Sequence, residues 1–181
     1  MGKVYVFLAQ GFEEIEALTV VDLGRRAGLE VETVSITTDR TVVGARKIPV
    51  VADTVFTAID TKNADMLVLP GGGPGWQNLE KCEELMKLVD SFAKENRKIS
   101  AICAAPSVLG RRGILKGKKA SVYPGMEEAL LGAKVSMDAV SVDGNLITSR
   151  GVGTAIDFAL AIIESLLNKE TATKIKNSIV Y

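Results

Sequence analysis

The sequence predicts an α/β fold with three layers, in which a mostly parallel β-sheet lies between two layers of helices. Three observations predict it. Short apolar runs with the length of buried strands alternate with segments that repeat apolar residues at helical spacing. The first strand, helix and second strand follow one another closely, as in a βαβ unit with a right-handed crossover. No repeat, low-complexity segment or linker interrupts the 181 residues, so we expect one domain over 1–181.

The N-terminal half opens with a βαβ pattern. Acidic Glu13 and Glu14 favour the start of a helix, and Gly28 favours its end. We expect the short strands after this unit to form a hairpin on one edge of the sheet. The predicted elements are a strand at 4–9, a helix at 13–27, a strand at 29–36, short strands at 41–43 and 48–51, and a core strand at 66–69.

In the C-terminal half, Asp143-Gly144-Asn145 is typical of a hairpin turn between two strands. The other predicted elements are a helix with Cys82, Leu85, Val89 and Phe92 on one face, a strand at 99–102, a helix of about two turns from Pro106, short strands at 120–123, 135–136, 140–142 and 146–148, a helix with an apolar stripe over 156–167, and a last helix near 170–178.

The amino-acid composition limits the classes of partner and active site that we expect. The 22 basic residues equal the 22 acidic residues, which gives no electrostatic reason to expect nucleic acid or a membrane surface as a partner. The chain has no segment typical of a membrane span or a signal peptide, and its two cysteines do not form a disulfide framework, so we expect a cytoplasmic location. Histidine is absent, which excludes Ser-His-Asp and Cys-His pairs and makes a metal site unexpected.

Cys103 is the first candidate for chemistry. It follows an apolar strand and precedes a helix, and its neighbours Ala101, Ala104 and Ala105 are small, as a nucleophile elbow requires. The N-terminus of that helix favours a thiolate and a lowered thiol pKa. A buried core cysteine fits the local sequence about as well. Cys82, on an apolar helix stripe, is interpreted as a core residue.

Two further features are expected at the same edge of the sheet. The glycine-rich turn 71–75 offers backbone amides to an oxyanion, although it could equally be a tight turn that needs glycine. It is neither a phosphate-binding loop nor a dinucleotide fingerprint. Glu13, Glu14 and Glu16 suit a helix start, but a carboxyl there could also reach the thiol and replace the missing histidine as acid or base.

Five ordered motifs now point to a family. They lie at 8–16, 22–28, 69–79, 101–106 and 148–154. With them the chain resembles the ThiJ/PfpI superfamily over nearly its whole length, and within it the branch of the parkinsonism-associated deglycase and its bacterial relatives. The resemblance implies a class I glutamine amidotransferase-like (flavodoxin-like) fold and a homodimer without a cofactor. It also implies site roles: Cys103 as the nucleophilic, oxidisable thiol, Glu16 as the carboxyl that hydrogen-bonds it, the Gly72 and Ala104 amides as oxyanion donors, and Arg46, Gly73 and Tyr123 in the pocket.

One position departs from that family pattern. Many members carry a histidine where this chain has Tyr123, which disfavours an intracellular cysteine peptidase because a phenol is a poor base at neutral pH. The resemblance implies an enzyme of the deglycase or glyoxalase III type, a hydrolase or lyase that acts on small reactive carbonyls or their adducts on proteins and thiols. The alternative is an oxidative-stress sensor or redox-linked chaperone that uses the same cysteine.

Overall fold

A computed structural model describes residues 2–181. Its centre is a seven-stranded sheet in the order β10-β11-β7-β6-β1-β2-β5, in which every pairing is parallel except that of β10 with β11. The strands are β1 (Lys3–Leu8), β2 (Glu30–Ser35), β5 (Thr54–Val55), β6 (Met66–Leu69), β7 (Lys98–Ile102), β10 (Val140–Asp143) and β11 (Leu146–Ser149). Two small sheets pair β3 (Thr41–Val43) with β4 (Pro49–Val51), and β8 (Lys119–Ala120) with β9 (Lys134–Val135).

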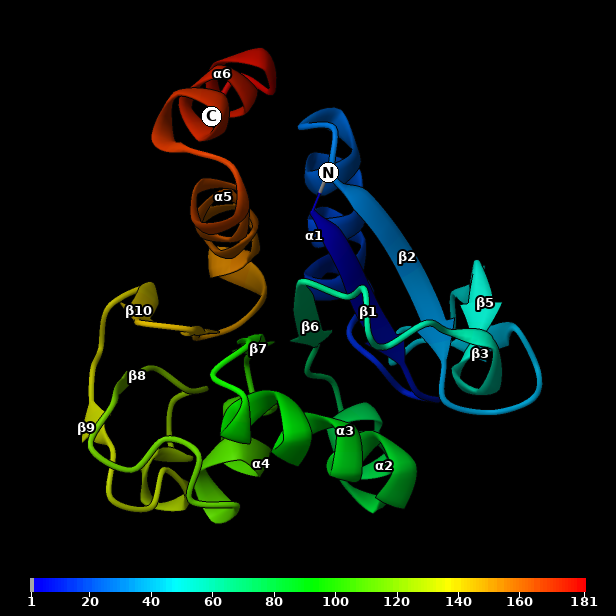
Figure 1. Ribbon diagram of the computed structural model, residues 1–181, viewed down its shortest axis with the longest axis horizontal. Helices are drawn as coiled ribbons and strands as arrows, with labels where there is room; N and C mark the ends of the chain where they lie inside the picture. Colours follow the sequence, from blue (N-terminus) through cyan, green and yellow to red (C-terminus); the bar gives the residue numbers. More distant parts are fainter. Residues whose placement is uncertain (1) are drawn as a thin grey trace.

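Helices cover both faces of the large sheet (Figure 1). One layer contains α1 (Glu14–Arg26), α5 (Ala155–Leu166) and α6 (Lys169–Ser178). The other contains α2 (Gly75–Lys81), α3 (Glu83–Lys94) and α4 (Pro106–Arg111). Short 3-10 turns lie at Phe56–Ala58, Glu127–Ala129 and Val152–Thr154. Among residues 2–181, no helix combines the length and apolar character that crossing a membrane requires.

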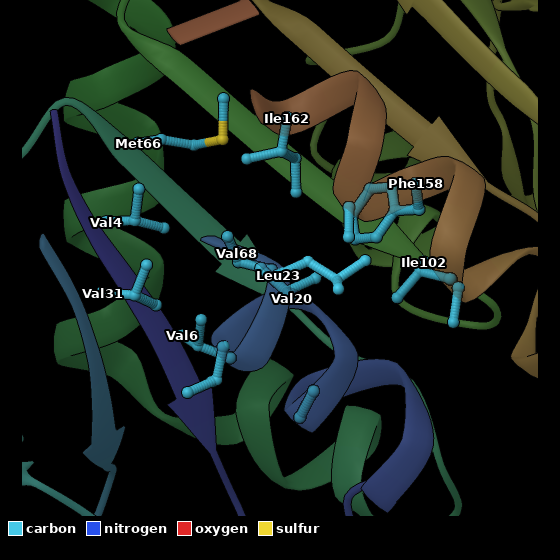
Figure 2. Close-up of a cluster of buried hydrophobic side chains, with 14 of the residues drawn as sticks. Val4, Val6, Val20, Leu23, Val31, Met66, Val68, Ile102, Phe158 and Ile162 are labelled. Carbon is cyan, nitrogen blue, oxygen red and sulfur yellow. The ribbon is translucent and has the colours of Figure 1, made fainter. Parts of the chain in front are cut away.

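Alternation along the central strands explains the two layers. Val4 and Val6 of β1 point to the layer of α1 and α5, whereas Tyr5 and Phe7 point to the layer of α2–α4. Figure 2 shows the first of these cores, where strand side chains meet Phe158 and others from the helices. Full burial of each side chain of this size contributes about 1.5–3 kcal/mol, which fixes the strand register and hence the edge at which each strand ends.

The order of the strands creates a crevice at their carboxyl ends. The chain leaves β1 through α1 towards β2, and leaves β6 through α2 and α3 towards β7 on the other face. In parallel sheets of this kind, ligands bind at the carboxyl edge where the winding direction reverses. Here that point lies between β1 and β6, and the segments after β6, β7 and β11 meet beside it.

The structure corrects several predicted elements. The hairpin at 41–51 exists, but it forms a separate sheet, and the edge of the large sheet is the unpredicted β5. Helix α2 begins inside the glycine-rich turn and was not predicted, while α3 begins one residue after Cys82. The strand expected at 120–123 is replaced by the two-residue strand β8, which shares only Ala120 with the expected range. The hairpin turn between β10 and β11 is confirmed, as are α1, α5 and α6 within about two residues.

Candidate functional site

Cys103 occupies a constrained turn directly after β7. Its φ is 64°, the left-handed region that side-chain-bearing residues rarely adopt. Its backbone N–H donates to the Ser149 carbonyl at 3.0 Å, and its carbonyl accepts from the Tyr123 N–H at 2.8 Å. These two hydrogen bonds hold the turn to the segments on either side. The half-buried thiol is thereby presented at the carboxyl edge of the sheet, as expected of a nucleophile elbow.

Glu16 lies beside this thiol, in the first turn of α1, with none of its surface exposed. Its Oε2 accepts from the Gly71 N–H at 2.8 Å, and its Oε1 is buried without a hydrogen bond of standard geometry. Gly71 permits the approach: a Cβ there would be 2.6 Å from the Cys103 Cβ and 2.8 Å from Glu16 Oε2. Carboxyl, glycine and thiol are therefore packed as one unit.

The protonation states of the thiol and of the carboxyl depend on each other. Burial raises the pKa of Glu16 to about 7, against the hydrogen bond from Gly71. With Glu16 ionised, burial and then its negative charge raise the pKa of Cys103 to about 12, while the Ala104 and Gly72 amides lower it. The helix N-terminus was expected to lower this pKa, and that expectation is wrong, because burial and the neighbouring carboxylate outweigh the two amides. Transfer of the thiol proton to Glu16 removes the carboxylate charge, and with it the part of the increase in the thiol pKa that this charge causes.

A cavity of about 680 Å³ opens above this pair. All the residues that the family resemblance implied for the site line it: Glu16, Arg46, Gly72, Gly73, Cys103, Ala104 and Tyr123. The amides of Gly72 and Ala104 both act on the sulfur, so the two turns after β6 and β7 converge as expected. The Tyr123 side chain is 50% exposed at the rim.

The three acids at the start of α1 face different partners. Glu13 lies 3.6 Å from the Arg46 guanidinium, whose side chain is 73% exposed. Glu14 is buried and accepts from the Arg46 N–H at 2.8 Å, which ties α1 to the β3–β4 hairpin. Glu16 alone contacts the thiol region. The choice of Glu16 over its two neighbours, which the family resemblance implied, agrees with this placement.

Sequence reasoning missed part of the cavity wall. Arg150, Trp76 and Met126 line it, and the first two lie within the motifs at 148–154 and 69–79 but received no role. Arg150 could have been found, because it follows a strand at the same edge as Cys103. Cys82 lies outside the cavity, half-buried, with its sulfur 3.9 Å from Glu84 Oε2. Within residues 2–181, no three potential ligands among Cys, Asp and Glu gather as a metal site would require.

Comparison with known proteins places the chain in a family. Residues 2–165 match the family model of the DJ-1/PfpI family. The chain is 37% identical over 180 residues to Protein DJ-1 homolog B of Arabidopsis thaliana, covering 98% of this chain but only 41% of that relative. It thus spans less than half the length of this plant protein and of its homolog A.

Two further comparisons extend over most of both chains. The chain is 34% identical over 161 residues to the glutathione-independent glyoxalase DJR-1.2 of Caenorhabditis elegans, covering 87% of this chain and 84% of the relative. The oxidised Toxoplasma gondii DJ-1 structure has a TM-score of 0.95 and 36% identity, covering 100% of this chain and 99% of the other. The predicted fold and the resemblance drawn from the motifs are confirmed. This chain belongs to the DJ-1/PfpI family.

Proposed function

We propose that this protein is a cofactor-independent enzyme that uses Cys103 to convert reactive dicarbonyls, or their early adducts on thiols and amines, into hydroxy acids. One observation carries the proposal. The buried Glu16 carboxyl lies beside the Cys103 thiol, with one oxygen held by the Gly71 N–H and the other buried without a hydrogen bond of standard geometry. With a pKa of about 7, this carboxyl can both accept and return a proton near neutral pH.

The first step is addition of the thiol to the aldehyde carbon. Glu16 takes the proton from Cys103, the sulfur forms a bond to C1 of methylglyoxal, and the C1–O π electrons move to oxygen. The amides of Gly72 and Ala104 stabilise the developing oxyanion. The proton then passes to that oxygen, which gives a neutral hemithioacetal and leaves Glu16 ionised, ready to act as a base.

The second step moves a proton between carbons. The Glu16 carboxylate removes the C1 proton, which forms an enediolate with its negative charge on the C2 oxygen. Glu16 then returns that proton to C2, while the proton of the C1 hydroxyl passes to the C2 oxygen. The result is a lactate thioester on Cys103 in which C1 is oxidised and C2 is reduced, so no external oxidant or reductant is needed. Water attacks the thioester carbonyl, the sulfur leaves as the thiol with a proton, and lactate is released.

The experiment is to incubate the purified chain with methylglyoxal and to follow lactate. We expect lactate to form faster than in buffer, and Cys103→Ser to remove the difference because the weakly acidic hydroxyl is a poor nucleophile at this site. Cys82→Ser is the matched control, since that sulfur lies outside the cavity. Lactate formation no faster than in buffer would refute the proposal. The name of the C. elegans relative supports this choice of substrate.

A redox sensor is the second candidate. The Gly72 and Ala104 N–H groups point to the half-buried Cys103 sulfur, and they could equally hold an oxygen of a sulfinate. The T. gondii relative is described as oxidised. Peroxide titration, followed by measurement of the intact mass, tests whether the protein is a redox sensor. Selective addition of two oxygens at Cys103, with none at Cys82, would favour this candidate, whereas equal oxidation of both cysteines would remove it.

A further inference from the structure

Arg150 projects from the segment that lies beside the thiol. Ser149, the last residue of β11, pairs with Ile102, the last residue of β7, so Arg150 and Cys103 leave neighbouring strands at the same edge. The Cys103 N–H bond to the Ser149 carbonyl holds the two segments together at 3.0 Å. Both residues line the same cavity. The backbone of Arg150 is therefore held beside that of the proposed nucleophile, and its side chain contributes a cation to the cavity.

The guanidinium of Arg150 lacks a strong partner within the protein. Its Nε is buried without an acceptor, and its Nη1 donates to the Met137 carbonyl at only 3.4 Å. Among residues 2–181, Arg150 forms no ion pair within 4.0 Å. Its charge contributes to lowering the pKa of the Glu127 carboxylate, but the two groups do not form an ion pair. In the part of the chain that the structure describes, the Arg150 Nη2 has no hydrogen bond to the protein, so the outer edge of the guanidinium can donate to a ligand in the cavity.

Arg46 adds a second positive group to the same cavity. Its guanidinium lies 3.6 Å from Glu13, a long and largely exposed contact that leaves most of its donors unused. Trp76 and Met126 form an apolar part of the wall. A small neutral dicarbonyl would use the thiol, the carboxyl and the amides, but it would add no anionic acceptor for either guanidinium group.

Resting on the proposed function, we infer that the preferred substrate carries a carboxylate, which Arg150 binds through its planar guanidinium while Arg46 adds to the attraction. The substrate class is thus an α-ketoaldehyde, or its early adduct, with an anionic group on the side away from the aldehyde. Guanidinium matches carboxylate geometry through two parallel hydrogen bonds. The reaction remains the internal redox step described above, because the carboxylate takes no part in bond formation.

One experiment tests this inference without requiring turnover. Iodoacetate and iodoacetamide are an anionic and a neutral reagent of similar size, and their alkylation rates at Cys103 can be followed by peptide mass. Relative to the urea-unfolded chain, we expect the native protein to favour iodoacetate by about tenfold, as one charge-assisted hydrogen bond would give. Arg150→Gln should abolish most of that preference. Lys169→Gln, which removes an exposed charge outside the cavity, should leave it unchanged.

The same pair of reagents separates binding from thiolate stabilisation. If Arg150 only favours the thiolate, Arg150→Gln slows both reagents equally and leaves their ratio intact, which would overturn the inference. Protection of Cys103 from iodoacetamide by inorganic phosphate but not by succinate would also overturn the carboxylate assignment. Protection by succinate that Arg150→Gln weakens would support it.

The rate of turnover gives a second test of the inference. The probe is 4,5-dioxopentanoate, which would give 2-hydroxyglutarate, compared with its neutral methyl ester. We expect kcat/KM to favour the acid by about tenfold, and Arg150→Gln to remove the preference mainly through KM. Equal kcat/KM for acid and ester refutes the inference but leaves the proposed function standing. Absence of turnover with methylglyoxal and with both probes refutes the proposed function, and the alkylation ratio then still decides the role of Arg150.

Discussion

The backbone conformation of Cys103 presents the thiol at the site but is unfavourable for the stability of the turn. A φ of 64° brings the Cβ of an ordinary residue too close to its own backbone, and glycine alone avoids this cost. We therefore expect Cys103→Gly to be more stable than Cys103→Ala by about 1 kcal/mol in urea denaturation. The control is Ala101→Gly within β7, where the same type of change should destabilise by about 0.5–1 kcal/mol. Equal stability of the two Cys103 variants would contradict this account.

Individual site residues differ in how far the sequence predicts them. Cys103 follows from a local pattern, small residues between an apolar strand and a helix, and this pattern survives in the structure. The pKa of its thiol does not follow, because it depends on Glu16, which is distant in sequence and held in place by Gly71. Arg150 can be placed at this edge from its position after a strand, but only packing reveals that its Nε is buried without an acceptor.

At the scale of elements, the glycine-rich turn after β6 is where prediction failed most clearly. Glycine and proline are poor helix formers, so a helix beginning at Gly75 is not expected from propensity. Tertiary contacts impose it: the Gly75 N–H donates to the Gly11 carbonyl at 3.1 Å, and a Cβ at Gly75 would lie 2.5 Å from the Phe12 nitrogen. Glycine here permits two backbones to approach, a requirement that the local pattern does not reveal.

The same turn gives a prediction about Gly71. A methyl group there would meet the Cys103 Cβ at 2.6 Å and the Glu16 carboxylate at 2.8 Å, so the elbow and the first turn of α1 must separate. We expect Gly71→Ala to destabilise the protein by about 1–3 kcal/mol and to reduce lactate formation. Gly73→Ala is the control for stability, because nothing lies within 4 Å of its Cβ position. A Gly71→Ala variant with the stability of Gly73→Ala would contradict the packing described.

For the whole molecule, the sequence pattern predicted the layers well. Continuous short apolar runs in the strands, with helices between them, are typical of a parallel sheet covered on both faces. In such a sheet the chain segments after β6, β7 and β11 lie at one edge. The order of the strands and the separate β3–β4 sheet could not be predicted, since they depend on which surfaces pack together rather than on any local pattern. The edge of the sheet that carries the site could therefore be predicted, but the relative positions of the site residues could not.

The buried carboxyl should also affect the stability of the whole molecule. The folded state raises the pKa of Glu16 from 4.5 to about 7, so it holds a proton that the unfolded chain releases at lower pH. The free energy of unfolding should fall as the pH rises from 4.5 to about 7, by about 3 kcal/mol, and change little above that from this group. Urea denaturation across this range should show the fall in wild type and not in Glu16→Gln. Parallel pH profiles for the two proteins would contradict the raised pKa.

The most direct test of the central claim is the rate of lactate formation from methylglyoxal by four proteins: wild type, Cys103→Ser, Glu16→Gln and the double variant. If thiol and carboxyl act as one unit, each single substitution should lower the rate by about 100-fold or more, and the double variant should lose no more than the worse single variant. A Glu16→Gln variant that turns over at the wild-type rate, or losses that multiply in the double variant, would contradict the account.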